Sequence, residues 1–79
     1  MIKSDEKGYL WIGGKEGVYC FDKEKEVFTL EKNNIQYTSE IAFDGDYIWV
    51  SSSFYGLYKL DRSGNILKHY QQKSDKMAI

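Results

Sequence analysis

The stretch that decides the fold is Tyr9-Leu10-Trp11-Ile12, because the chain repeats its pattern at Tyr47-Ile48-Trp49-Val50. Each segment is aromatic, aliphatic, tryptophan, aliphatic, and the second tryptophan follows the first by 38 residues. Downstream, Gly17-Val18-Tyr19-Cys20-Phe21-Asp22 matches Gly56-Leu57-Tyr58-Lys59-Leu60-Asp61 at an offset of 39 residues. A nearly fixed period of this length is the signature of a repeat architecture. We therefore interpret the chain as two copies of one structural unit.

Both tryptophan segments are predicted to be β-strands, Tyr9–Gly13 and Tyr47–Ser51, because they are rich in aromatic and β-branched residues and bounded by Gly, Asp and Ser. Apolar side chains alternate onto both faces of each strand, so we expect both faces to be buried. The other expected strands are Ile2–Ser4, Val18–Phe21, Val27–Leu30, Glu40–Phe43, Leu57–Leu60 and Ile66–Tyr70. The repeats thus contain four antiparallel strands each.

Four antiparallel strands in roughly 40 residues is the size of one β-propeller blade. The chain has no proline and no 3.6-residue apolar period, so no helix of useful length is expected. We predict an all-β fold of two four-stranded antiparallel β-propeller blades, a partial propeller. Residues 1–33 form the first blade, with a truncated first strand, and residues 34–79 form the second blade plus a tail. Residues 71–79 either begin a further strand or fray.

Composition argues against several classes of function. The 79 residues contain twelve acidic and eleven basic side chains, and this balance gives no basic surface for nucleic acid. One cysteine and one histidine cannot form a zinc site or an internal disulfide. The longest apolar stretches have four residues, so no membrane contact is expected, and residues 1–5 show no secretory signal.

Several residues have a chemical interpretation, but for each of them a structural interpretation is favoured. Residues 13–17 lack the spacing of a phosphate loop, and residues 51–53 lack the glycines of a nucleophile elbow. Asp44 and Asp46 flank a hairpin glycine, a position that explains both residues without calcium or acid–base catalysis. His69 is expected at the surface, and Cys20 as a small buried apolar residue. We therefore predict no enzymatic activity, no metal and no cofactor.

The aromatic residues leave two alternatives open. Trp11 and Trp49 occupy equivalent repeat positions, which favours blade packing over stacking on a sugar or nucleobase. Phe54 and Tyr55 instead lie in a loop that has one residue more than its counterpart in the first repeat, outside the repeating pattern. They are the best candidates for ligand-binding residues, although cross-blade packing of their rings is the interpretation favoured here too.

The repeat resembles the two-component-regulator propeller repeat over about residues 5–70. The similarity rests on Asp5, Gly8-Tyr9-Leu10-Trp11-Ile12-Gly13, Gly17-Val18-Tyr19, Phe21-Asp22 and Phe28. The second repeat follows the pattern, with Ser51 in place of glycine. In that family many such blades build the extracytoplasmic sensor region of hybrid histidine kinases. The resemblance implies a periplasmic, non-catalytic sensor in signal transduction that binds an oligosaccharide or other small ligand, or mediates dimer contacts, with no kinase region in these residues.

Two blades are fewer than the four to eight that close a propeller, so apolar faces are left uncovered. We expect either packing with further blades, as a fragment of a longer receptor, or self-association. The fragment is favoured because Ile2-Lys3-Ser4 resembles a strand cut at its start. The main alternative function is a structural or protein-interaction propeller module without a small ligand. A fragment of a propeller lyase or hydrolase is the least favoured, because no acid–base or metal cluster is visible.

Overall fold

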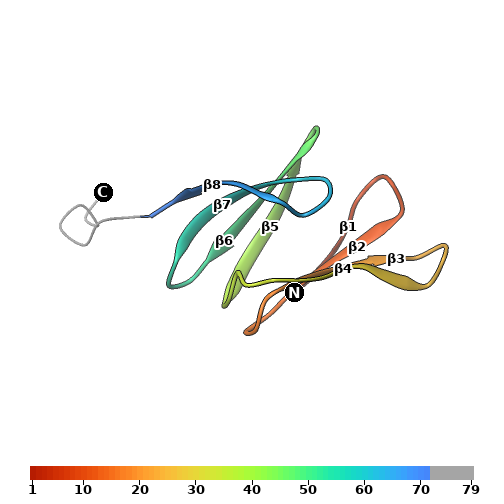
Figure 1. Ribbon diagram of the computed structural model, residues 1–79, viewed down its shortest axis with the longest axis horizontal. Helices are drawn as coiled ribbons and strands as arrows, with labels where there is room; N and C mark the ends of the chain where they lie inside the picture. The colour runs from red at the N-terminus through yellow and green to blue at the C-terminus, as the bar shows by residue number, and fades with distance from the viewer. Residues whose placement is uncertain (72–79) are drawn as a thin grey trace.

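The described part of the chain is all-β and forms two antiparallel four-stranded sheets (Figure 1). The structure is a computed structural model that describes residues 1–71, with the backbone alone for residues 29–33. Sheet 1 has the order β1-β2-β3-β4 and sheet 2 the order β5-β6-β7-β8. The strands are β1 (Ile2–Ser4), β2 (Tyr9–Gly13), β3 (Val18–Asp22), β4 (Val27–Asn33), β5 (Thr38–Asp44), β6 (Tyr47–Ser52), β7 (Gly56–Asp61) and β8 (Ile66–Tyr70).

The all-β prediction is confirmed for the described residues, which include every predicted strand and no helix. The largest differences are at β4 and β5, which are each three residues longer than expected. β5 gains Thr38 and Ser39 because this end of the strand pairs with Ser52 and packs on the first sheet. Of the tail predicted over residues 71–79, residues 72–79 lie outside the described residues.

The hairpin turns form at the residues that favour turn conformations. Gly45 and Gly64 adopt φ angles of 59° and 90°, a left-handed conformation that glycine tolerates without strain. The loop at residues 22–26 has no glycine, and Glu26 takes the left-handed position with a φ of 59°. Asp22 stabilises this loop, because its carboxylate accepts hydrogen bonds from the backbone N–H groups of Glu24 and Lys25.

The core lies between the two sheets, and each sheet contributes a different face to it. We call the side of each sheet that bears its repeat tryptophan the tryptophan face, and the opposite side the aliphatic face. The tryptophan face of sheet 1 packs against the aliphatic face of sheet 2, and β2 lies beside β5. The buried apolar residues are Trp11, Val18 and Cys20 from sheet 1, Ile35 from the linker, and Ile41, Ile48, Val50, Tyr58 and Leu60 from sheet 2.

The expectation that both faces of the tryptophan strands are buried is wrong for this structure. Trp11 is only 1% exposed, whereas Trp49 is half-buried and Tyr47 beside it is 40% exposed. The reason is geometric: two sheets bury one face each against the other and leave the two outer faces without a covering layer. The prediction that the two tryptophans are equivalent holds for sequence position but not for burial.

Gly13 allows the two sheets to approach closely. A Cβ atom added at this glycine would lie 2.5 Å from Cγ2 and 2.8 Å from Cβ of Thr38, the first residue of β5. We expect Gly13→Ala to lower the free energy of unfolding by about 1–3 kcal/mol, since the sheets must move apart to relieve the overlap. Urea denaturation followed by circular dichroism measures the change. Gly14→Ala is the matched control, because no atom lies within 4 Å of its added Cβ.

Candidate functional site

Three aromatic side chains gather where the linker between the sheets meets the β6–β7 loop. Tyr37 belongs to the linker, and Phe54 and Tyr55 belong to the loop. The rings of Tyr37 and Phe54 meet edge to face, with centroids 4.9 Å apart, and the ring of Tyr55 lies 6.4 Å from that of Tyr37. We call these three residues the aromatic cluster.

A buried serine holds the β6–β7 loop against the linker. The Oγ atom of Ser52 donates a 2.7 Å hydrogen bond to the carbonyl oxygen of Gln36 and accepts hydrogen bonds from the backbone N–H groups of Phe54 and Tyr55. The backbone N–H of Ser53 donates to the carbonyl oxygen of Tyr37 at 2.9 Å. These bonds fix the loop and the linker relative to each other, so the cluster is positioned before any ligand arrives.

The same linker connects the cluster to the first repeat. The backbone N–H of Tyr37 donates to the carbonyl oxygen of Lys15 in the β2–β3 loop, and the backbone N–H of Thr38 donates to the carbonyl oxygen of Gly14 in that loop. Tyr37 adopts a left-handed φ of 56°, which is uncommon for a residue with a bulky side chain. Such a conformation persists only where the surroundings enforce it, and here hydrogen bonds to both repeats do so.

The cluster offers apolar rings and hydroxyl groups to solvent. Phe54 is 73% exposed and Tyr55 is 41% exposed, while Tyr37 is half-buried beneath them. The two tyrosines add hydroxyl groups that donate and accept hydrogen bonds. A nitrogen of the His69 ring lies within hydrogen-bond distance, 2.6 Å, of the carbonyl oxygen of Tyr55, and this contact links the loop to β8. The arrangement suits a ligand with apolar C–H surfaces edged by hydroxyls.

A second cluster of polar groups, at Asp5, has a structural explanation. One carboxylate oxygen of Asp5 accepts hydrogen bonds from the Trp11 indole at 3.0 Å and from Arg62 of sheet 2 at 3.2 Å. The other oxygen accepts bonds from the backbone N–H groups of Lys7 and Tyr9. Burial alone would raise the pKa of Asp5, but the hydrogen bonds from Tyr9, Trp11 and Lys7 and the Arg62 charge outweigh it, and the pKa is lowered from 3.8.

Phe54 and Tyr55 both lie beside Tyr37, which sequence reasoning missed, and their role as ligand-binding residues stays a prediction. Tyr37 lies near the start of the second repeat, between the predicted strands Val27–Leu30 and Glu40–Phe43, where no sequence pattern marked it as part of a site. Cys20 is buried, as expected, and His69 is exposed, although its ring stacks on Tyr58 with centroids 3.9 Å apart. Among the residues whose side chains the structure describes, no three His, Cys, Asp or Glu are grouped to hold a metal ion.

Comparison with protein-family models, curated proteins and solved structures gives no match for this chain. Among the described residues there is no helix with the length and apolar character needed to cross a membrane.

Proposed function

We propose that the chain is a pair of β-propeller blades of the two-component-regulator type, and that it acts as a non-catalytic, periplasmic ligand-sensing module in signal transduction. The sensor belongs to a histidine kinase whose kinase region is outside these residues. The observation that supports the blade assignment is the packing of unlike faces, in which the tryptophan face of one repeat covers the aliphatic face of the next. In a propeller, each blade covers the next one with the same face, so blades stack in this order all the way around the ring.

The proposed ligand is an oligosaccharide that binds at the aromatic cluster. Three properties support the choice of this cluster: the rings of Phe54 and Tyr55 are exposed, two of the three rings carry hydroxyls, and hydrogen bonds with two serines of the loop preorganise the cluster. Stacking on Phe54 and Tyr55 requires no charge on the ligand. A neutral sugar therefore fits this surface better than an ion does.

The alternative function is a structural or protein-interaction module that binds no small ligand. The observation that favours it is the amount of apolar surface left on the outer faces of both sheets, where Tyr47, Leu57 and Phe28 are each more than a third exposed. Exposed apolar surface of this kind is typical of protein contacts. The alternative predicts that no sugar perturbs the aromatic cluster.

The sensing proposal is tested by nuclear magnetic resonance on the 15N-labelled chain, titrated with cellohexaose, xylohexaose and maltohexaose. We expect at least one of these sugars to shift the amide signals of Tyr37, Phe54 and Tyr55. Shifts confined to other parts of the chain, or the absence of shifts with all three sugars, contradict the oligosaccharide proposal and favour the interaction module.

Replacing Phe54 and Tyr55 together by alanine is expected to abolish those sugar-induced shifts at Tyr37 while leaving the thermal midpoint close to that of the unmodified chain. Both side chains are exposed, and substitutions at such sites usually change stability by less than about 0.5 kcal/mol each. Phe28→Ala is the control, since it removes an exposed ring from sheet 1. A double variant that unfolds, or that keeps the shifts, would show that the rings serve packing instead.

A further inference from the structure

The two outer faces of the molecule are the repeat counterparts of the two faces buried in its core. On sheet 2, Trp49 and Leu57 take the positions that Trp11 and Val18 occupy on the buried tryptophan face of sheet 1. Yet Leu57 is 37% exposed and Trp49 is half-buried. The chain therefore presents a second tryptophan face that nothing in the described structure covers.

The outer face of sheet 1 has the chemistry that would cover it. Strand register places five of its residues at the positions of residues buried on the aliphatic face of sheet 2. These residues are Ile2, Leu10, Ile12, Tyr19 and Phe21, and their counterparts are Ile41, Ile48, Val50, Tyr58 and Leu60. All five are apolar or aromatic, so the two outer faces complement each other as the two inner faces do.

We infer that the outer tryptophan face of one chain binds the outer aliphatic face of a second copy, head to tail, in the arrangement that joins the two sheets within one chain. This inference rests on the blade assignment within the proposed function. Such a contact uses different surfaces on the two copies, so it repeats until a ring closes. Because propellers close with about four to eight blades, the ring would contain about two to four copies.

The two charges of the ion pair that joins the sheets recur at the equivalent positions of the other repeat. Within the chain, Nη1 of Arg62 from sheet 2 lies 3.2 Å from a carboxylate oxygen of Asp5 in sheet 1. The repeat counterparts of these residues are Lys23 and Asp44, each exposed and lying in the opposite sheets. Asp44 also accepts a hydrogen bond from the Trp49 indole, at 3.3 Å, as Asp5 does from Trp11. In the head-to-tail contact, Lys23 of one copy meets Asp44 of the next.

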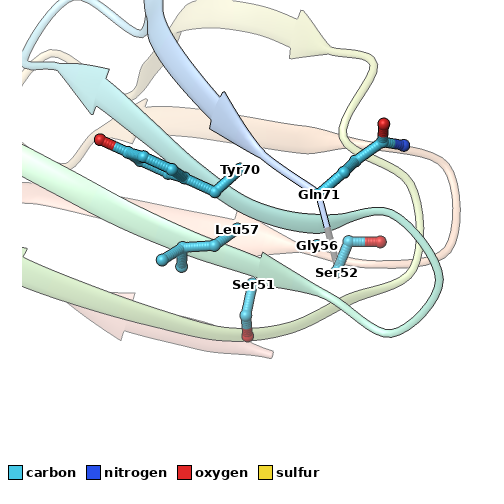
Figure 2. Close-up of a pocket in the computed structure, with 6 residues that line it drawn as sticks. All are labelled: Ser51, Ser52, Gly56, Leu57, Tyr70 and Gln71. Atoms are coloured by element: carbon cyan, nitrogen blue, oxygen red, sulfur yellow. The ribbon is translucent and has the colours of Figure 1, made fainter. Parts of the chain in front are cut away.

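An open depression on the outer tryptophan face marks where the partner packs. It has a volume of about 380 Å³, and Ser51, Leu57 and Tyr70 contribute to its lining. Figure 2 shows the side chains of Leu57 and Tyr70 extending in the same direction from neighbouring strands. At the equivalent place on sheet 1, Thr38 of the second sheet packs directly on Gly13. The depression therefore corresponds to a position that is filled inside the chain.

Lys59 makes the contact between copies weaker than the contact within the chain. It replaces the buried Cys20 of the first repeat, and its Nζ lies 4.1 Å from the ring centroid of Tyr47 and 5.5 Å from that of Trp49. A long lysine side chain can keep its charge at the rim while its methylene groups are covered. Since moving that charge from water has a cost, we expect an assembly that dissociates on dilution.

The test is sedimentation velocity on the 79-residue chain and on two charge variants, Lys23→Glu and Asp44→Lys, across a range of concentrations. The unmodified chain is expected to form a discrete species of about two to four copies. Each variant alone places two like charges opposite each other and is expected to raise the dissociation constant about fivefold or more per contact. The double variant Lys23→Glu/Asp44→Lys is expected to restore assembly whatever the number of copies, because the introduced glutamate of one copy then faces the introduced lysine of the next.

The controls are Lys25→Glu and Asp46→Lys, which make the same charge changes two residues away, at positions without a role in the proposed pair. Leu57→Glu is expected to prevent assembly, because it places a carboxylate on the outer tryptophan face. Circular dichroism checks that each variant is folded.

An unmodified chain that stays monomeric overturns the inference, as do single charge variants that assemble normally or a double variant that fails to regain assembly. None of these outcomes involves the aromatic cluster, so the oligosaccharide proposal can fail or succeed separately.

Discussion

Replacing Trp11 by alanine is expected to lower the free energy of unfolding by about 3–5 kcal/mol, enough to unfold a domain of marginal stability. Trp11 is 1% exposed and lies in the core between the two sheets. Removal of its ring opens a cavity between Val18 and the aliphatic face of sheet 2, and it also removes the indole donor from Asp5. Urea denaturation followed by far-ultraviolet circular dichroism measures the loss.

Trp49→Ala is the matched control, because the residue has the same repeat position but a half-buried ring. Its ring stacks on Tyr70 at a centroid distance of 6.2 Å, lies 5.5 Å from Nζ of Lys59 and donates an indole hydrogen bond to Asp44 at 3.3 Å. The monomer is therefore expected to lose far less stability with this variant than with Trp11→Ala. Equal losses at low protein concentration would contradict the assignment of Trp11 to the core and of Trp49 to an outer face.

The repeat made the secondary structure predictable from the sequence, because pattern and spacing determine it locally. Two β-strands that share an aromatic–aliphatic–Trp–aliphatic pattern must fall at equivalent places, and Tyr9–Gly13 and Tyr47–Ser52 do so. The turn glycines Gly45 and Gly64 were predictable for the same reason, since their left-handed φ angles are set by turn geometry.

Burial was less predictable, because it depends on how many sheets stack. The repeat pattern gives Trp11 and Trp49 the same local environment, yet only Trp11 faces another sheet within the described residues. Alternation within a strand shows which residues share a face, but it does not show whether a neighbour covers that face. The expectation of two buried faces assumed neighbours on both sides of each sheet.

The candidate site was predictable in part. Phe54 and Tyr55 stood out because they interrupt the repeat. Tyr37 joins them through long-range hydrogen bonds, from Ser53 to Tyr37 and from Tyr37 to Lys15, which no local pattern encodes. Likewise, Asp5 precedes its tryptophan just as Asp44 does, but the ion pair with Arg62 depends on the stacking of the sheets.

Asp5→Ala is expected to lower the free energy of unfolding by about 3 kcal/mol or more, since each hydrogen-bonding group left unpaired in the interior costs about 1–3 kcal/mol. The Asp5 side chain is 1% exposed and accepts bonds from Trp11, Arg62 and two backbone N–H groups. Asp44→Ala is the matched control. Asp44 is exposed and bonds more loosely to its tryptophan, so a loss below about 0.5 kcal/mol is expected.

The contribution of Asp5 should also depend on pH in a defined direction. Its pKa in the folded chain is lower than the ordinary value of 3.8, so the unfolded chain takes up the proton first as the pH falls. The stability from the Asp5 carboxylate is therefore fully present above the unfolded pKa, and it is lost as the pH falls through the lower, folded value. Asp61 contributes in the same direction, because hydrogen bonds from Asn65 lower its pKa as well.

Asp5→Asn separates these two contributions, because it removes one titrating group and leaves Asp61 in place. We expect the difference in unfolding free energy between the unmodified chain and Asp5→Asn to be constant from about pH 7 to about pH 5 and to shrink below about pH 4. Urea denaturation at a series of pH values measures this difference. A difference that stays constant down to about pH 2 would show that the carboxylate charge of Asp5 does not stabilise the junction between the two sheets.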